Sequence, residues 1–377
     1  MIKLENVTKV YPDGTEAVKE LNLEVGEGEF CVLLGPSGCG KTTTMKMINR
    51  LIPITEGRIY VNGQDTTALD ENELRRSIGY AIQEIGLFPH MTVGQNIATV
   101  PRLLKWPKDK CRRRAAELLE LVGLTPPDQF IDRFPAELSG GQRQRVGVAR
   151  CLGADPPILL MDEPFGAIDP ITREKLQNEF LKIQQKLKKT IVFVTHDLNE
   201  AIKMGDKIAL MREGSLVQYD SPAAILSQPN DRFVREFVGA DRALKGLRLM
   251  RVREVMRTSP PTVRPGDSVE AARKEMDRAK RNWAVVVEEG GKFLGWVNRE
   301  DLGDGASVEE VMMPPSTTAD ELTFLNEGLS LMLMTAIGNL AIVDDAGKLK
   351  GVLTFDAIRN VLGELYSEGE PAEGVGE

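Results

Sequence analysis

Cysteine is scarce in this sequence, and its pattern excludes two kinds of site. The 377 residues include only Cys31, Cys39, Cys111 and Cys151. Their spacing matches neither a metal-binding nor a redox motif. We therefore expect four free thiols in a reducing compartment.

Long apolar runs are also missing. No window approaches the roughly 18 uninterrupted apolar residues of a candidate membrane span, so we expect this chain not to cross a bilayer. Residues 1–5 (Met-Ile-Lys-Leu-Glu) carry no apolar signal core, which argues against secretion. If the protein serves a membrane, it does so by binding a separate membrane protein.

An overall excess of positive charge is absent too. The net charge of −8 argues against a nucleic-acid binder, because such proteins usually present a large positive surface. The average conceals an asymmetry. Residues 242–281 hold twelve Lys or Arg and five Asp or Glu, a net of +7, so the remainder carries −15.

The first 240 residues alternate apolar strands with helical periodicity. We expect strands at residues 25–34, 78–82, 158–161 and 191–195, and helices at residues 42–51 and 172–188. This order predicts an α/β domain with a largely parallel sheet. The segment from about residue 84 to 150 is rich in helix formers, which predicts a helical insertion.

The rest of the chain repeats itself. Val-Arg-Glu-Val-Met at residues 252–256 recurs as Val-Glu-Glu-Val-Met at residues 308–312, a period of 56 residues. Each copy continues with two apolar strands, at residues 284–287 and 293–297, and at residues 340–343 and 349–354. Such a repeat predicts two similar α+β units packed together. Residues 366–377 hold four glutamates and no basic residue, which predicts a disordered acidic tail.

A glycine-rich loop stands between the first strand and the first helix and fits G-x-x-x-x-G-K-[ST]. Glycines let backbone N–H groups turn toward phosphate oxygens, and the helix points its positive end at the same anion. We expect Lys41 to reach the β- and γ-phosphates of a nucleotide and the Thr42 hydroxyl to ligate Mg²⁺. The predicted phosphate-binding residues are Gly35, Pro36, Ser37, Gly38, Cys39, Gly40, Lys41 and Thr42.

Two acids end the strand at residues 158–161. Alone, such a pair is typical of a solvated strand terminus. With a phosphate loop in the same chain, we interpret Asp162 as part of the metal shell and Glu163 as the group that polarises the attacking water.

Three further residues complete the candidate site. Gln83 follows a strand and is placed to sense Mg²⁺ and the γ-phosphate. His196 ends another strand, where it either has a structural role or hydrogen-bonds the γ-phosphate. Tyr11 either stacks on an adenine ring or is a surface aromatic of a strand.

These residues, with Leu-Ser-Gly-Gly-Gln at residues 138–142, resemble the nucleotide-binding subunits of ATP-binding cassette (ABC) transporters over residues 2 to about 238. The resemblance implies a P-loop NTPase fold that binds ATP with Mg²⁺. It extends the phosphate loop to Thr43 and makes Gln83 and His196 catalytic together with Lys41 and Glu163. Residues 165–169 become the D-loop, in which Gly-Ala-Ile-Asp replaces the commoner Ser-Ala-Leu-Asp but keeps Asp169.

The resemblance also implies a head-to-tail homodimer. The signature residues of one subunit then face the γ-phosphate held by the other; they are Ser139, Gly140, Gly141 and Gln142. The physical chemistry agrees, because serine is a good helix N-cap and the two glycines let a helix N-terminus approach a phosphate. No single chain would then hold a complete active site.

The 56-residue repeats resemble a tandem of cystathionine-β-synthase (CBS) domains. The combination is similar to the ATPase subunits of glycine betaine, carnitine and choline importers. It implies a peripheral protein at the cytoplasmic face of the membrane, with separate permease subunits and, indirectly, an extracytoplasmic substrate-binding protein. The expected domains are a cassette at 1–240 with its helical part at about 84–150, a linker helix with the first CBS unit at 241–303, the second at 304–365 and the tail at 366–377.

The role of the CBS pair stays open at this point. Neither copy matches the G-x-x-T-x-x-D pattern of adenosine-binding pairs, because Asn298 replaces the threonine in the first and Asp356 stands one residue early in the second. Residues 242–281 either contact anionic lipid and so sense ionic strength, or are solvated helix faces. Two further alternatives are that the CBS pair binds a cyclic dinucleotide, as related importers do, and that it only helps the protein dimerise.

Two other functions compete with osmolyte import. One is an ABC importer for a different solute, such as a polyamine, an amino acid or a sulfonate. The other is a soluble ABC ATPase that acts on nucleic acid or the ribosome, although such chains usually carry two cassettes or a long coiled-coil insertion.

Overall fold

The computed structural model describes residues 1–82, 86–166, 169–303, 307–334 and 338–367. The chain forms two compact units. The first comprises residues 1–225 and 229–238, and the second comprises residues 226–228 and 239–377.

A six-stranded sheet forms the centre of the first unit. Its strands are β3 (Phe30–Leu34), β6 (Ile78–Ala81), β7 (Ile158–Asp162), β8 (Thr190–Val194), β9 (Lys207–Arg212) and β10 (Ser215–Asp220). In the order β10-β9-β3-β8-β7-β6, the pairs from β9 to β6 are parallel and β10 is antiparallel to β9. Strands β3, β7 and β8 are buried throughout, as expected for parallel strands covered on both faces.

A second, antiparallel sheet of the first unit was not predicted. It comprises β1 (Ile2–Val10), β2 (Glu16–Val25), β4 (Glu56–Val61) and β5 (Gln64–Asp65), in the order β2-β1-β4-β5. The single strand expected at residues 25–34 is wrong, because Val25 ends β2 and a turn separates it from β3. Gly28 in this turn has a φ of 74°, a conformation that glycine adopts at no steric cost.

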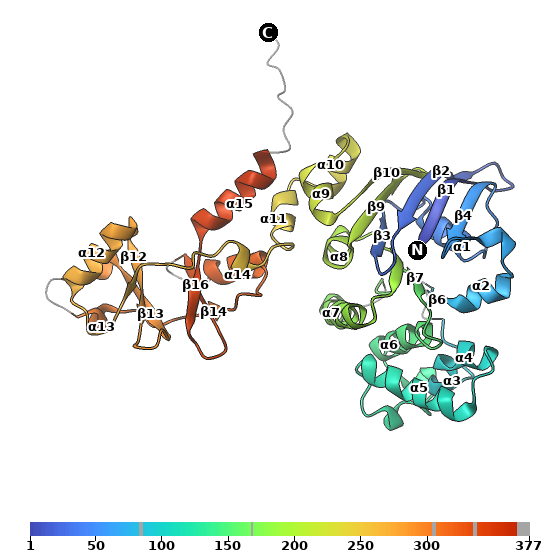
Figure 1. The fold of residues 1–377 in the computed structure, drawn as a ribbon, viewed down its shortest axis with the longest axis horizontal. Coiled ribbons are helices and arrows are strands. Elements are labelled where there is room, and N and C mark those ends of the chain that lie inside the picture. Colours follow the sequence, from blue (N-terminus) through green and yellow to red (C-terminus); the bar gives the residue numbers. More distant parts are fainter. Residues whose placement is uncertain (83–85, 167–168, 304–306, 335–337, 368–377) are drawn as a thin grey trace, which may run out of the picture. The chain divides into compact units, whose positions relative to one another are not determined.

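Helices cover both faces of the central sheet. The helices that begin in the first unit are α1 (Lys41–Ile48), η1 (Thr66–Ala68), α2 (Glu71–Ser77), α3 (Val93–Ile97), α4 (Thr99–Leu103), α5 (Lys108–Leu121), η2 (Pro127–Gln129), η3 (Pro135–Glu137), α6 (Gly140–Cys151), α7 (Pro170–Leu187), α8 (Leu198–Met204), α9 (Pro222–Ser227) and α10 (Arg232–Val238). Helices α3, α4 and α5 pack beside one another and against α6, which also contacts β6, and together they form the predicted helical insertion (Figure 1).

Alternation along the strands explains which helix covers which face. Cys31 of β3 belongs to a buried cluster with Met45 of α1 and with residues of the antiparallel sheet. Side chains one position along a strand point to the opposite face. Accordingly Phe30 contacts Phe180 of α7, with ring centroids 6.1 Å apart. The phosphate-loop helix and α7 therefore pack on opposite faces.

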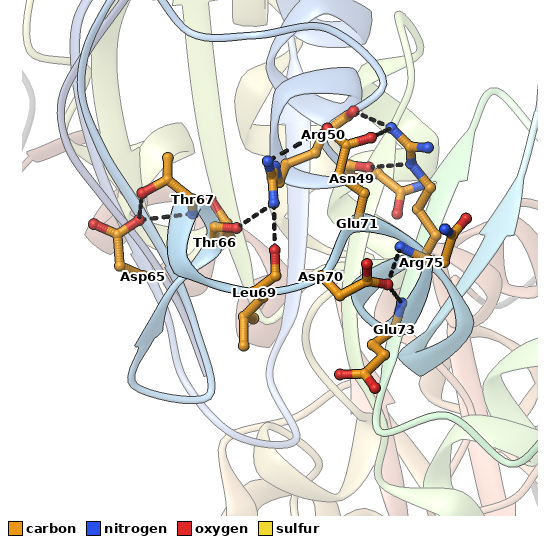
Figure 2. A network of polar contacts seen from close by, with 11 residues as sticks. Asn49, Arg50, Asp65, Thr66, Thr67, Leu69, Asp70, Glu71, Glu73 and Arg75 are labelled. Carbon is orange, nitrogen blue, oxygen red and sulfur yellow. Dashed lines mark hydrogen bonds and ion pairs between the residues drawn. The ribbon is translucent and has the colours of Figure 1, made fainter.

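Helix α1 ends earlier than its apolar periodicity predicts. The helix expected at residues 42–51 stops at Ile48, because Arg50 adopts a φ of 48°. Figure 2 shows the reason: Arg50 donates to Thr66 O at 2.8 Å and to Leu69 O at 2.7 Å, and Arg75 of α2 donates to Arg50 O at 2.5 Å. These contacts fix the end of α1 to the segment that leads into β6.

The second unit contains two three-stranded sheets, one for each repeat. Its elements are α11 (Arg242–Gly246), η4 (Val252–Glu254), β11 (Thr262–Val263), α12 (Val269–Ala279), β12 (Trp283–Val287), β13 (Phe293–Asn298), η5 (Arg299–Asp301), α13 (Val308–Val311), β14 (Thr318–Ala319), α14 (Leu325–Leu333), β15 (Asn339–Val343), β16 (Leu349–Thr354) and α15 (Phe355–Ser367). In each sheet a short parallel strand, absent from the prediction, precedes an antiparallel pair. Helix α15 extends two residues into the predicted tail, and the rest of that tail lies outside the described residues.

The two repeats exchange their leading segments. Val252, which begins the first copy, is buried in a cluster with Leu325 and Leu353 of the second. Val308, which begins the second copy, is buried in a cluster with residues of the first. Backbone bridges join Arg257 to Val352 and, one period later, Met313 to Trp296. Neither repeat therefore completes its core without the other.

Within the described part of the chain, none of the helices is both long and apolar enough to cross a membrane.

Candidate functional site

The loop between β3 and α1 has the backbone that phosphate binding requires. Gly35, Gly38 and Gly40 have φ values of 147°, 80° and 100°, which residues with a side chain rarely adopt. A Cβ on Gly35 would lie 2.2 Å from Met211 O, and one on Gly40 would lie 2.4 Å from Ala17 O. Glycine is therefore needed at residues 35 and 40 for space as well as for conformation.

Lys41 is held inside this loop. Its ammonium donates to Gly35 O at 2.7 Å and to Pro36 O at 2.9 Å, and it lies 3.7 Å from Cys39 Sγ. The residue is only 6% exposed. The positive charge is thus held within the loop at which the sequence predicts phosphate binding.

Thr42 and Asp162 meet at the carboxyl end of β7. Thr42 Oγ1 donates to Asp162 Oδ1 at 3.1 Å, and Asp162 is 4% exposed. Burial raises the pKa of this carboxyl, and the Thr42 hydrogen bond opposes the rise. A divalent cation between a hydroxyl and a carboxylate offsets the cost of a buried charge.

The pair therefore fits Mg²⁺, which usually keeps several waters and takes only one or two protein oxygens. In the described ranges, no group of three or more His, Cys, Asp or Glu is arranged to hold a metal.

Glu163 and His196 lie together at the ends of neighbouring strands. Glu163 Oε1 is 3.1 Å from His196 Nδ1, and the two side chains are 21% and 62% exposed. Glu163 has a φ of 44°, and its N–H donates to Val194 O at 3.0 Å. Backbone strain of this kind clusters at functional sites. The structure thus brings together the two residues to which the sequence assigned the water and the γ-phosphate.

Tyr11 follows β1 and lies beside the phosphate-loop helix. Its hydroxyl is 3.4 Å from Thr43 Oγ1, and Lys9 Nζ is 5.3 Å from the centroid of its ring. The ring is half-buried. Its position next to the phosphate loop suits the adenine-stacking interpretation.

The signature segment begins α6. Ser139 is the N-cap, its Oγ accepts from Gln142 N at 3.3 Å, and Gln142 Oε1 accepts from Ser139 N at 2.9 Å. This capping box orients the helix and occupies the Gln142 side chain. Ser139 and Gly140 are exposed, and Gly141 is half-buried. In the described residues, no hydrogen bond or ion pair joins Ser139 to the phosphate loop of its own chain.

The D-loop is anchored at both ends. Asp169 caps α7 by accepting from Thr172 N at 3.0 Å, a hydrogen bond that lowers the pKa of Asp169. Phe165 is buried against Phe180 and Phe193, with ring centroids 6.3 Å and 5.9 Å away. Residues 167 and 168 and the predicted Gln83 lie outside the described residues.

Comparisons with known proteins agree with this geometry. Residues 18–166 match the family described as ABC transporter, and residues 252–303 and 308–364 match the CBS domain. The carnitine transport ATP-binding protein OpuCA of Listeria monocytogenes is 46% identical over 94% of this chain and 90% of its own length. The chain belongs to the ATP-binding subunits of ABC transporters.

A second relative of this ABC subunit is the osmoprotectant import ATP-binding protein OsmV of Salmonella typhimurium, 47% identical over 96% of both chains. A solved dimeric structure of an ATP-binding cassette in a post-hydrolysis state, bound to ADP and Pi, has a TM-score of 0.53 and 38% identity, and covers 59% of this chain and 99% of that chain. The predicted P-loop cassette and tandem CBS pair are thereby confirmed, and the subunit is an ABC-type ATPase.

Sequence reasoning missed two polar residues beside the site. Gln177 of α7 and Glu200 of α8 are 6% and 7% exposed and bond to each other. No motif includes them. The available signal was the position of Gln177 on the inner face of α7, next to Leu176 and on the same side as Phe180.

Proposed function

We propose that this chain is the ATPase subunit of an importer for a quaternary ammonium osmolyte, namely glycine betaine, carnitine or choline. The observation that carries the proposal is the extent of the similarity. Relatives named for carnitine transport and osmoprotectant import align over 94% and 96% of the chain, through the cassette and the CBS pair together. An importer for a polyamine or an amino acid is the alternative.

We infer that the nucleotide binds between Tyr11 and the phosphate loop. Tyr11 stacks on adenine, and Lys41 with the loop N–H groups holds the β- and γ-phosphates. Thr42 and Asp162, 3.1 Å apart, supply protein oxygens for Mg²⁺. The bound ion neutralises negative charge on the phosphates. Gln83 is proposed to contact the same ion and the γ-phosphate.

The hydrolytic step is proposed to use Glu163 and His196. Glu163 accepts a hydrogen bond from water, whose oxygen bonds to the γ-phosphorus as the bond to the β,γ-bridging oxygen breaks. The water's proton passes to a phosphate oxygen, and the products are ADP and phosphate. His196, 3.1 Å from Glu163, donates to a γ-phosphate oxygen. Both roles stabilise charge in a preformed site, which is the main source of catalysis in phosphoryl transfer.

The site is proposed to be completed by a second copy of the chain. Ser139 and Gly140 are exposed at the N-terminus of α6, where helix dipole and free N–H groups attract anions. In a head-to-tail homodimer, these groups and Gly141 face the γ-phosphate on the partner, and Asp169 lies at the same interface.

We further propose that the helical region binds the permease. Phe88, Leu103 and Leu104 are 39%, 54% and 42% exposed, and all three lie between the Gln83 segment and α5. Large apolar side chains that are left exposed within one short region of the sequence are the support for this proposal. The subunit then sits peripherally at the cytoplasmic face of the membrane, and an extracytoplasmic binding protein acts on it through the permease.

Reconstitution tests the proposed substrate class. The complete importer, assembled in vesicles with its permease and binding protein, is expected to hydrolyse ATP several times faster when carnitine, choline or glycine betaine is present. Putrescine and glutamine, which lack a quaternary ammonium group, are the matched controls. Stimulation by a control alone contradicts osmolyte import, and recovery of the chain with RNA in place of a permease supports the non-transport alternative.

The CBS pair is proposed to regulate this activity. Several basic side chains in residues 242–281 already have partners: Arg281 bonds to Asp356 at 3.0 Å, and Arg251 stacks on Phe324. The Arg281 contact crosses between the repeats, so a ligand that competes for it changes how they are joined. Anionic lipid and a cyclic dinucleotide are the candidate ligands.

Vesicle composition tests the lipid form of this proposal. With anionic lipid present, uptake is expected to rise with internal salt concentration, because screening weakens contacts between basic side chains and head groups over about 8 Å at physiological salt. Neutral vesicles are the control, and the same salt dependence in both excludes a lipid sensor. Calorimetry with a cyclic dinucleotide tests the other candidate ligand, and the absence of binding heat excludes it.

A further inference from the structure

Glu200 is a buried carboxyl that the steps above do not use. It lies on α8, is 7% exposed and accepts from Gln177 Nε2 at 2.9 Å. Gln177 is equally buried on α7. Burying a carboxyl opposes its ionisation, so a residue of this kind is retained only where its partners hold it. Its partners are Gln177 and Arg173 of α7 and Thr195 of the loop that carries His196.

One set of contacts leads from Glu200 to His196. Burial raises the pKa of Glu200, and hydrogen bonds from Thr195 and Gln177 oppose the rise. Thr195 directly precedes His196, and its hydroxyl also accepts from Asp197 N at 3.0 Å. Glu200 therefore contacts the loop that places the imidazole.

A second set leads to Glu163. The positive charge of Arg173, on α7, attracts the Glu200 carboxylate and lowers the pKa of Glu200. The Arg173 guanidinium donates to Gly166 O at 3.4 Å, and Gly166 N donates to Glu163 O at 3.1 Å. The backbone of Glu163 is thus linked to the same network as the loop of His196.

A small cavity joins these groups. Its volume is about 20 Å³, room for about one water molecule, and its walls include Glu163, Arg173, His196 and Glu200. The two residues proposed for chemistry and the buried carboxyl behind them therefore line a common space.

We propose that Glu200, with Gln177, is a positioning residue for ATP hydrolysis that fixes the His196 loop to α7 and so keeps His196 against Glu163. The inference rests on the proposed roles of Glu163 and His196. A purely structural role predicts changes in thermal stability alone, whereas positioning predicts loss of turnover with ATP binding retained.

Exchange of the two residues tests the inference. In the full-length chain, Gln177→Glu places two carboxylates in contact, and kcat at pH 8 is expected to fall about 10- to 100-fold with KM for ATP little changed. Glu200→Gln keeps an acceptor but loses the charge facing Arg173, so a smaller, severalfold fall is expected. The double variant Gln177→Glu/Glu200→Gln restores a donor and an acceptor, and is expected to recover most of the wild-type kcat.

The pH profile gives an independent readout. Relative to wild type, the defect of Gln177→Glu is expected to shrink from pH 8 to pH 6, because a proton shared by the two carboxyls restores their hydrogen bond. The charged groups facing this pair are Arg173, Asp197, Glu163 and His196, and wild type carries the same four. Glu174→Gln is the matched control, since it removes only an exposed 3.7 Å ion pair with Lys203 between the same two helices.

The outcomes separate this inference from the proposed mechanism. A double variant no faster than Gln177→Glu, or variants that lose thermal stability while kcat stays at the wild-type value, overturns the positioning role. If Gln177→Glu does not fold, Glu200→Gln decides: a lower kcat at an unchanged unfolding temperature supports the role, and an unchanged kcat overturns it. Glu163→Gln assayed in parallel reports on the proposed mechanism itself.

Discussion

Glu163→Gln is expected to bind ATP and to pair with a second copy, while its turnover falls about 10²- to 10⁴-fold. The amide has the shape of the carboxylate and still reaches His196, 3.1 Å away. It accepts a hydrogen bond from water less strongly and carries no charge, so the water is not polarised. The change removes an interaction needed in the transition state and leaves the groups that hold ATP intact.

Phosphate release measures the turnover, and size-exclusion chromatography with ATP measures the pairing of two copies. Glu236→Gln is the control, because Glu236 is 63% exposed on α10, where it pairs with Arg232. Wild-type turnover in Glu163→Gln contradicts the assignment. Loss of ATP-dependent pairing in that variant contradicts the separation between binding and chemistry.

The phosphate loop could be predicted because its chemistry depends on spacing. Gly35, Gly40 and Lys41 stand in a fixed local pattern. The structure explains the two glycines, because a Cβ at either position would collide with a backbone oxygen. The acids at the end of β7 and the histidine after β8 were predictable for a related reason. Parallel strands end at one edge of a sheet, so residues distant in sequence meet there.

Other features depended on contacts that no local pattern records. The antiparallel sheet was missed because β1 mixes buried and exposed positions without clean alternation. The exchange of leading segments was missed because Val252 begins the first repeat in sequence but packs against Leu325 of the second. Gln177 and Glu200 are 23 residues apart, and only the packing of two helices makes them partners.

The active site of this chain is proposed to form between two copies. Lys41→Ala removes the ammonium that serves the β- and γ-phosphates. Gly140→Glu places a carboxylate where the partner's γ-phosphate is proposed to bind, while a Cβ at residue 140 meets nothing within 4 Å in its own chain. Each variant alone is expected to lose about 10²- to 10³-fold in turnover, because every site in its homodimer has one defective half. Gly266→Glu, at another uncrowded glycine, is the control for added charge.

The most direct test is to mix the two defective variants before adding ATP. In a mixed dimer, the Gly140→Glu chain contributes an intact phosphate loop and the Lys41→Ala chain contributes an intact signature, so one of the two sites is complete. Equal mixing with random pairing is therefore expected to restore turnover to as much as about a quarter of the wild-type value, as the two-fold symmetry of the dimer requires. Turnover that stays at the mean of the two separate variants contradicts a site shared between copies.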